Sequence, residues 1–360
     1  MKMKALIAMS GGVDSAVAAY LMKKQGYDCI GVTMKLFQSD DVKVKGEHSC
    51  CSLDDVQDAK AVARKLDMPH YVFNFADGFR ECVIDHFVTS YENGVTPNPC
   101  IECNRHMKFF KLYQRAKELS CDYIVTGHYA HIVFNEETGR YNLKKSGDDE
   151  KDQTYVLYSM TQDQLAHTIF PLSDMKKPHV REIAAENGFI NAGKAESQDI
   201  CFVPDGDYAG FIEKYTGRKY PAGDFVDRDG NVIGKHNGII RYTIGQRKGL
   251  GIAAPEPYYV TDIDVTNNKV TLSHGEGLFA KGVIADNVNL ISVPEIKGEM
   301  RVGAKIRYRH REQPAVATME DGRLKVIFDE PQRAATKGQA LVLYDGDNVV
   351  GGGTICQIIK

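Results

Sequence analysis

The start of the chain joins a short apolar run to a helical pattern through a pair of glycines. The run Ala5–Met9 leads through Ser10-Gly11-Gly12 into a helical pattern that begins near Val13. Two consecutive glycines permit backbone angles closed to other residues, so successive amide N–H groups can point at one centre. The first turn of the helix adds unsatisfied N–H groups and the positive end of the helix dipole. This pattern predicts a strand, a turn and a helix that bind an anion at the edge of a parallel sheet.

Strand and helix patterns then alternate to about residue 130, which predicts a parallel sheet with crossover helices. The predicted strands are Ala5–Met9, Cys29–Leu36, His70–Phe75 and Tyr123–Thr126. The predicted helices are Asp14–Gln25, Leu53–Leu66, Phe79–Tyr91 and Met107–Leu119, the first closed by Gly26. The fold class we expect here is α/β, with an open doubly wound parallel sheet in an N-terminal domain over residues 1–204.

The pattern becomes β-rich after about Pro204. Before that point, residues 135–153 are polar and predict a surface excursion or a short hairpin, and helical patterns follow at Gln162–Thr168 and Pro178–Asn187. We expect a small central β-rich connector domain at 205–282, with strands at Gly238–Tyr242, Tyr258–Ile263 and Lys269–Ser273. We expect a C-terminal β-barrel at 283–360, with strands at Lys305–Arg309, Ala315–Met319, Leu324–Phe328, Ala340–Tyr344 and Val349–Ile358.

Composition limits the classes of protein to which the chain can belong. Its 360 residues exceed one ordinary domain, and 43% hydrophobic with 26% charged residues is the balance of a globular protein. The sequence shows no secretory leader pattern and no apolar run of membrane-spanning length, so we expect a cytoplasmic protein. With a net charge of −3, any nucleic-acid binding must come from local basic patches. Nine cysteines without an export signal predict thiols, metal ligands or redox catalysts rather than a disulfide scaffold.

The string Ser-Gly-Gly-Val-Asp-Ser at residues 10–15 has two interpretations. A serine N-cap with glycines for turn geometry would explain an isolated glycine pair. The full string at the first strand–helix turn is more specific, and no Gly-Lys-Ser/Thr follows as in a Walker loop. The string resembles the signature of ATP pyrophosphatases, which include asparagine, GMP and argininosuccinate synthetases and several RNA-thiolating enzymes. This resemblance implies cleavage of ATP between its α and β phosphates, with AMP placed on an oxygen and pyrophosphate released.

A second candidate site lies in the proline-stiffened loop that contains Cys100 and Cys103. We expect Cys103 close to the N-terminus of the following helix, where the dipole and nearby cations can lower the pKa of its thiol from ~8.5 and make it a nucleophile. Those cations are Arg105, His106 and Lys108. Cys201, within the string Ser-Gln-Asp-Ile-Cys-Phe, is the other candidate thiol. Spacing alone does not join the two loops.

Further motifs accompany these two in a fixed order along the chain. They are Asn98-Pro99 with Cys103-Asn104 and Lys108-Phe109, Thr126-Gly127-His128-Tyr129, Lys151-Asp152-Gln153, Ser197 to Cys201, Tyr242 to Gly249 and Arg307-Tyr308-Arg309. Together with the turn at residues 10–15 they resemble the tRNA-specific 2-thiouridylase family over nearly the whole chain. The resemblance implies an adenine nucleotide alpha-hydrolase-like N-terminal fold, a tRNA-binding C-terminal barrel and modification of the uridine at the tRNA wobble position.

The resemblance also implies roles for individual residues. ATP, with Mg²⁺ as its expected cofactor, would be bound by Ala8, Met9, Ser10, Gly11, Gly12, Val13, Asp14, Ser15, Met34 and Gly127. Cys201 would accept sulfur as a persulfide from an upstream protein donor. Cys103, a nucleophile or acid–base group, would resolve the persulfide and pair with Cys201 as a disulfide. The target base would contact Asn98, Pro99 and Cys100, and the rest of the tRNA would contact His128, Lys151, Asp152, Gln153, Arg307, Tyr308 and Gln339.

The Cys-x-x-Cys pair Cys100 and Cys103 fits, by itself, half a zinc site or a redox pair. No second such pair or His pair completes four zinc ligands, and Cys50-Cys51 are adjacent, which is a poor spacing for one ion. The thiols of Cys100, Cys103 and Cys201 could instead hold three irons of a [4Fe–4S] cluster, a hypothesis that stays open beside persulfide chemistry. The cysteines expected in the core are Cys29, Cys82, Cys121 and Cys356.

The densest basic run of the C-terminal half extends from Arg301 to Arg311. Alternation along a strand would put its cations on one face as a rail for RNA phosphates. The rail would consist of Lys305, Arg307, Arg309 and Arg311. A merely solvated strand face explains the same pattern.

Two other functions fit parts of the sequence. An ATP pyrophosphatase that amidates or ligates a small molecule would need the turn at residues 10–15 but neither the spaced cysteines nor an RNA-binding tail. A non-catalytic adenine-nucleotide sensor would need only the N-terminal fold. The function that we expect is ATP-dependent sulfur transfer to tRNA, with these two as alternatives.

Overall fold

The computed structural model describes residues 2–37, 53–194 and 200–360. Its N-terminal part contains a five-stranded sheet in the order β3-β2-β1-β4-β7. The strands are β1 Lys4–Ala8, β2 Asp28–Lys35, β3 His70–Asn74, β4 Tyr123–Val125 and β7 Thr168–Ile169. All neighbouring strands run parallel, as predicted.

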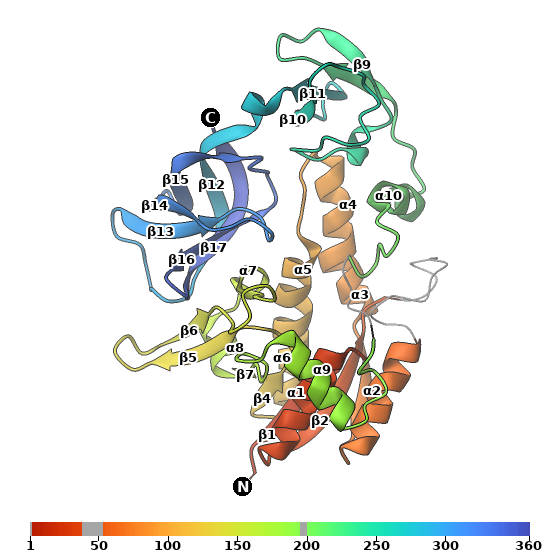
Figure 1. Cartoon of the computed structure of the whole chain (residues 1–360), viewed down its shortest axis with the longest axis vertical. Helices are drawn as coiled ribbons and strands as arrows, with labels where there is room; N and C mark the ends of the chain where they lie inside the picture. Colours follow the sequence, from red (N-terminus) through yellow and green to blue (C-terminus); the bar gives the residue numbers. More distant parts are fainter. Residues whose placement is uncertain (1, 38–52, 195–199) are drawn as a thin grey trace.

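Helices cover both faces of this sheet (Figure 1). On one face lie α1 Val13–Lys24, α2 Leu53–Lys65 and α9 Lys177–Glu186. Ala5 and Ile7 of β1 are buried in the cluster under these helices, whereas Leu6 between them belongs to the cluster on the other face. This alternation is the two-residue period of a strand, and it confirms the doubly wound arrangement.

Two long helical segments cover the second face. The first consists of α3 Ala76–Phe79, the π-helix η1 Arg80–Ile84 and α4 Asp85–Glu92. The second consists of α5 Pro99–Glu102, the π-helix η2 Cys103–Lys111 and α6 Leu112–Glu118. It begins at Pro99, whereas the sequence predicted a start at Met107. Asn98 caps it by accepting the N–H of Cys100 at 3.1 Å, and Pro99 suits the first helical position.

The polar segment at 135–153 contains part of a hairpin, one of its two predicted forms. The hairpin strands are β5 His131–Asn135 and β6 Arg140–Lys144, and the short helices α7 Thr154–Leu157 and α8 Gln162–Ala166 follow. Asn348 near the end of the chain pairs with Lys144 of β6. The hairpin therefore adds two strands from the N-terminal part of the chain to the edge of the C-terminal sheet.

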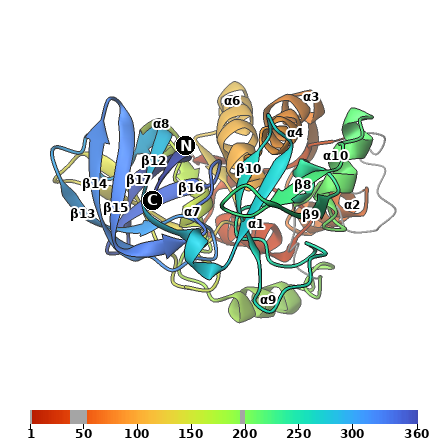
Figure 2. The same ribbon diagram turned by 90° about the horizontal axis from the view of Figure 1, so that it is seen from above.

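Six C-terminal strands close into an antiparallel barrel, which confirms the predicted barrel (Figures 1 and 2). They are β12 Phe279–Leu290, β13 Met300–Lys305, β14 Gln313–Glu320, β15 Arg323–Arg333, β16 Ala340–Asp345 and β17 Asn348–Ile359. Strand β12 pairs with both β15 and β17, and this double pairing closes the barrel. The predicted strand Lys305–Arg309 is wrong, because β13 ends at Lys305 and the chain then turns.

The central part contains α10 Tyr208–Thr216 and a four-stranded sheet in the order β10-β11-β8-β9. The strands are β8 Gly223–Val226, β9 Val232–His236, β10 Tyr259–Asp264 and β11 Lys269–Ser273. The predicted strand Gly238–Tyr242 is instead the 3₁₀-helix η3 Ile239–Arg241, since Gly238 turns the chain at φ 103°. A second 3₁₀-helix, η4 Gly275–Leu278, leads into β12. The domain boundaries expected at 204 and 282 stay predictions.

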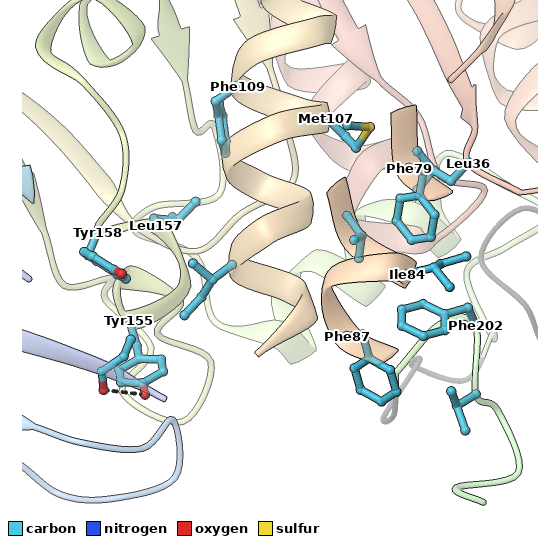
Figure 3. Packing of buried hydrophobic residues seen from close by; sticks show 14 of the residues in the cluster. Leu36, Phe79, Ile84, Phe87, Met107, Phe109, Tyr155, Leu157, Tyr158 and Phe202 are labelled. Carbon is cyan, nitrogen blue, oxygen red and sulfur yellow. Dashed lines mark hydrogen bonds between the residues drawn. The ribbon is translucent and has the colours of Figure 1, made fainter. Parts of the chain in front are cut away.

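One large hydrophobic cluster joins the N-terminal helices to the central part. Figure 3 shows the portion of it around Phe79, Phe87 and Phe202. Phe202 packs edge-on against Phe79 and Phe87, with ring centroids 5.8 Å and 5.3 Å apart. The same cluster includes Ile240 and Val260 of the central part. These two parts of the chain therefore share a core.

Replacing Phe202 by alanine should lower the free energy of unfolding by about 3–5 kcal/mol, because a buried ring is lost and a cavity is left. The measurement is the midpoint of urea unfolding. Phe110→Ala is the matched control, since Phe110 is 49% exposed and its loss should change stability by about 0.5 kcal/mol or less. Equal midpoints for the two variants would contradict the shared core.

Candidate active site

The turn at residues 8–15 joins β1 to α1 and is held by its own serines. The Ser15 hydroxyl donates to the Gly12 carbonyl at 2.9 Å and accepts the Ser10 N–H at 3.2 Å. Gly11 has a left-handed φ of 77°, and Gly12 is the N-cap of α1 without a side-chain cap of its own. The sheet edge, the turn and the start of α1 are thus arranged as the sequence predicted.

Neighbouring backbone approaches this turn so closely that only glycine fits at two positions. A Cβ atom on Gly11 would lie 2.5 Å from the carbonyl oxygen of Asp55 in α2. One on Gly127, which follows β4, would lie 2.8 Å from the carbonyl carbon of Asp14. Met34, the other predicted nucleotide residue outside the turn, is half-buried in the adjacent strand β2.

Side chains far along the chain, which no sequence motif indicated, hold the turn by direct hydrogen bonds. Both carboxylate oxygens of Asp14 accept from the Lys177 ammonium at 2.7 Å, and Tyr129 donates to the same carboxylate at 2.7 Å. The Asn191 amide donates to the Gly11 carbonyl at 3.0 Å. Lys177 and Asn191 lie 163 and 180 residues along the chain from their partners, so no local spacing could indicate them.

A second lysine pairs with the helix that faces the turn. The Lys194 ammonium donates to Asp55 at 2.7 Å and to Asp58 at 2.6 Å, both in α2. Burial alone would lower the pKa of Lys194, but the hydrogen bonds that its ammonium donates to these two carboxylates raise it above the usual value. The segment after α9 is therefore bonded both to the turn, through Asn191, and to α2, through Lys194.

The two candidate thiols pack against the same hydrophobic cluster. Cys103 opens η2 and is half-buried, and Cys201, also half-buried, precedes the anchored Phe202. Cys100 is exposed in the first turn of α5, so it lies nearer to the helix N-terminus than Cys103 does. Met107, one turn beyond Cys103, points toward the part of the cluster that contains Phe202 (Figure 3).

The cations expected to act on Cys103 have other partners. Arg105 and His106 both pair with Glu102, at 3.0 Å and 3.2 Å. Burial alone would raise the pKa of the Glu102 carboxyl, but the hydrogen bond from His106 and the charge of Arg105 hold it below its usual range. Lys108 instead donates to His128 at 3.3 Å. These contacts fix the positions of the three cations, and the lowered pKa expected for the Cys103 thiol stays a prediction.

All three parts of the chain meet at the loop before Asn98. Gln339 of the barrel donates to the Thr96 and Pro97 carbonyls at 2.9 Å and 3.2 Å. The Thr96 N–H donates to the Lys337 carbonyl at 3.1 Å, and its hydroxyl lies 3.4 Å from that of Thr243 in the central part. Gln339, predicted to contact tRNA, thus uses its amide N–H groups to hold the loop predicted to carry the target base.

The rail predicted from the basic run does not form. Arg307 turns inward and donates to the Ile244 carbonyl at 2.8 Å and to the Thr336 hydroxyl at 2.5 Å. Lys305 is half-buried over the Tyr155 and Tyr308 rings, 5.8 Å and 5.9 Å from their centroids. The prediction is wrong because β13 ends at Lys305, so strand alternation does not apply to the residues that follow.

The His128 ring is buried between Phe109 and Phe170. It is hydrogen-bonded to Thr126, and burial together with the charge of Lys108 lowers its pKa well below the usual value. The ring is therefore neutral at pH 7. The contact of His128 with tRNA stays a prediction. In this structure its side chain is buried among protein groups.

The predicted tRNA residues 151–153 lie beside Tyr308. The Asp152 carboxylate accepts from the Thr154 hydroxyl at 2.6 Å and from the Ser146 N–H at 3.2 Å, and burial raises its pKa despite these bonds. Tyr308, 39% exposed, donates to the Asp152 carbonyl at 3.4 Å. Gln153 accepts the Tyr129 N–H at 3.0 Å, which links this segment to the residue that bonds Asp14.

The hypothetical iron–sulfur cluster at Cys100, Cys103 and Cys201 stays a prediction. Within residues 2–37, 53–194 and 200–360, no three His, Cys, Asp or Glu side chains are close enough together to hold a metal ion. Cys50 and Cys51, considered for zinc, lie outside the described residues.

Among the helices in the described ranges, none has both the length and the apolar content needed to span a membrane.

Comparison with known families divides the chain into three matched stretches. Residues 3–205 match the tRNA methyl transferase HUP domain, residues 209–274 the tRNA methyl transferase PRC-barrel domain, and residues 280–355 the aminomethyltransferase beta-barrel domain. The first match alone covers more than half of the chain. It agrees with the parallel sheet described above, and the other two agree with the central and C-terminal β structure.

Similar proteins extend over the full length. The tRNA-specific 2-thiouridylase MnmA of Clostridioides difficile (strain 630) is 54% identical over 99% of this chain and 98% of its own. The protein of the same name from Clostridium acetobutylicum is 52% identical over 99% of this chain and 100% of its own, and MnmA 1 of Thermoanaerobacter sp. (strain X514) is 53% identical over 98% and 97%. Identity at this level over whole chains means that this chain belongs to the tRNA-specific 2-thiouridylase family.

Proposed function

We propose that this chain is an ATP-dependent sulfurtransferase that converts the wobble uridine of tRNA to 2-thiouridine in the cytoplasm. The observation that carries the proposal is the full-length similarity to proteins named tRNA-specific 2-thiouridylase. The geometry of the turn at residues 8–15 supports it, because the turn can receive phosphates at the start of α1. The matched domain descriptions mention methyl transfer, so the reaction must be distinguished by its product.

The first step of the proposed reaction is adenylation. ATP would lie with its phosphates over residues 8–15 and its adenine near Met34, and Gly127 would border the same pocket. The C2 oxygen of the uridine attacks the α-phosphorus, and the bond to the leaving pyrophosphate breaks. Mg²⁺ carried by ATP would neutralise phosphate charge at this point. The product is a uridine whose C2 oxygen has become part of a good leaving group.

The second step is sulfur transfer between two thiols. An upstream protein would donate sulfur to Cys201 as a persulfide, whose terminal sulfur attacks C2 while AMP leaves with the oxygen. The Cys103 thiolate then attacks Sγ of Cys201, forming a disulfide and freeing the sulfur on C2 as the thiocarbonyl. An external dithiol reductant restores both thiols. Met107, one turn beyond Cys103, points toward the part of the hydrophobic cluster that contains Phe202, the neighbour of Cys201, and this arrangement supports the pairing.

The tRNA contacts that we propose surround the loop at residues 95–100. The target base would meet Asn98, Pro99 and Cys100, at the start of α5. Tyr308 and residues 151–153 lie together next to this region, and the Cys100 thiol is near enough to Tyr308 to help raise the pKa of the phenol, after the larger effect of burial. His128, Arg307 and Gln339 would act from behind this surface, since each of them is engaged inside the protein.

Incubating wild-type protein with tRNA, Mg-ATP, a protein persulfide donor and a dithiol reductant should yield 2-thiouridine, which nucleoside mass spectrometry would identify. Pyrophosphate release should require tRNA, whereas a nucleotide sensor would release none. A methylated nucleoside, or pyrophosphate release driven by a small-molecule amine or acid without tRNA, would refute the proposal.

Cys103→Ser and Cys201→Ser should each lower 2-thiouridine formation by more than about 100-fold, because each removes a sulfur atom that the transfer step needs. Cys121→Ser is the matched control, since Cys121 is a half-buried thiol on the same cluster with a pKa raised by burial. The rates of thiolated nucleoside and of pyrophosphate formation are compared. A ligase would tolerate all three substitutions, and full activity of either test variant would exclude the two-thiol mechanism.

Gly11→Ala should weaken ATP binding by about tenfold or more, because the added methyl group meets the Asp55 backbone at 2.5 Å and the φ of 77° disfavours alanine. The KM for ATP measures the effect. Gly26→Ala is the control for backbone strain without a steric clash, since Gly26 has a φ of 88° but no heavy atom within 4 Å of the added Cβ. The KM for ATP should stay unchanged in this variant. An unchanged KM in Gly11→Ala would indicate that the turn does not bind the nucleotide.

A further inference from the structure

Two exposed arginines flank a tyrosine where the central part meets the barrel. Tyr259 begins β10, and the guanidinium of Arg333, at the end of β15, lies 4.7 Å from the centroid of its ring. Arg247 approaches the same phenol from the preceding loop. The hydrogen bond from Arg333 to the phenol lowers the pKa of Tyr259, and the positive charges of Arg333 and Arg247 lower it further. A loop and strand of the central part and the distant end of β15 thus bring two positive charges to one phenol.

Neither arginine has an acidic partner in the structure. Within the described ranges, no Asp or Glu oxygen lies within 4.0 Å of the guanidinium of Arg247 or of Arg333, although many other surface cations are paired in this way. Arg247 also borders a hollow of about 540 Å³ formed by the loop up to Tyr258. Glu256 lines the same hollow and lies 3.9 Å from His274. The two guanidinium groups therefore present unneutralised N–H donors to solvent.

An arginine stacked on a tyrosine ring is already ordered for binding an anion. The ring face restricts the side chain, so less conformational freedom is lost on binding, and the planar edge with its N–H groups stays available for a phosphate. Because Arg333 occupies a face of the Tyr259 ring, that face is closed to a base. The arrangement therefore favours a phosphate over a stacked nucleobase.

The arginine pair adjoins the loop proposed to hold the target base. Thr243 touches Thr96 of that loop, and Arg247 lies four residues beyond Thr243, which limits their separation to about 15 Å. Val260 and Gln246, the neighbours of Tyr259 and Arg247, are hydrogen-bonded at 3.0 Å. A polynucleotide seated at the loop can therefore reach the arginines within a few phosphate spacings.

We propose that Arg247 and Arg333, with Tyr259 holding Arg333 in place, form a subsite for the tRNA backbone that binds phosphates near the modified nucleotide. This inference rests on the proposed function, because it takes tRNA as the substrate. It also accounts for RNA binding by a chain with a net charge of −3, since the cations needed for phosphate contacts are gathered locally instead of spread over the surface.

Replacing Arg247 and Arg333 by glutamine should weaken tRNA binding by about tenfold for each arginine, the loss expected for one charge-assisted hydrogen bond. The slope of log affinity against log salt should become shallower by about one for each. Affinity is measured by fluorescence anisotropy at several salt concentrations, after thermal unfolding has established that the variants are folded.

Arg323→Gln is the matched control, because Arg323 is an exposed arginine at the opposite end of the same strand β15. Its affinity and salt slope should equal those of the wild type. If Arg247→Gln and Arg333→Gln also equal the wild type while the wild type forms 2-thiouridine, the subsite is refuted and the proposed function stands. If the wild type neither binds nor thiolates tRNA, both fail.

Discussion

Packing around Phe202 determines where the two candidate thiols lie. Its ring is held by Phe79 and Phe87 on the face of the parallel sheet that also receives Met107. Cys201 is the neighbour of Phe202, and Cys103 opens the helical segment that carries Met107. Burial of aromatic surface thus anchors both sulfur-bearing segments, which are distant in sequence, to one hydrophobic core.

The loop before Asn98 depends on contacts from every part of the chain. Gln339 and the Lys337 carbonyl hold it from the barrel, and Thr243 touches it from the central part. Arg307 ties the barrel to the central part nearby. Polar residues that a family resemblance associates with tRNA therefore also serve as internal hydrogen-bonding partners, so the same side chains couple the shape of the loop to the placement of the barrel.

Sequence patterns were sufficient for the parts of the fold that depend on local periodicity. The strand–turn–helix at residues 5–24 follows from apolar alternation and glycine placement and occurs as predicted. The terminal barrel was predicted as an architecture, but two of its six strands, β12 and β13, were not. The partners of the turn could not be predicted, because the hydrogen bonds to Asp14 and Gly11 come from residues more than 100 positions away. The rail predicted from the basic run was wrong for a related reason. The end of β13 is set by its pairing with β16, which the composition of the run does not indicate.

The π-helix η2 has a consequence for the orientation of Cys103. A π turn holds one residue more than an α turn, so the side of the helix that faces the core before Cys103–Lys111 is offset from the side that faces it afterwards. Removing one residue from the segment would rotate Cys103 by about 100° about the helix axis relative to the residues of α6, away from its present neighbours.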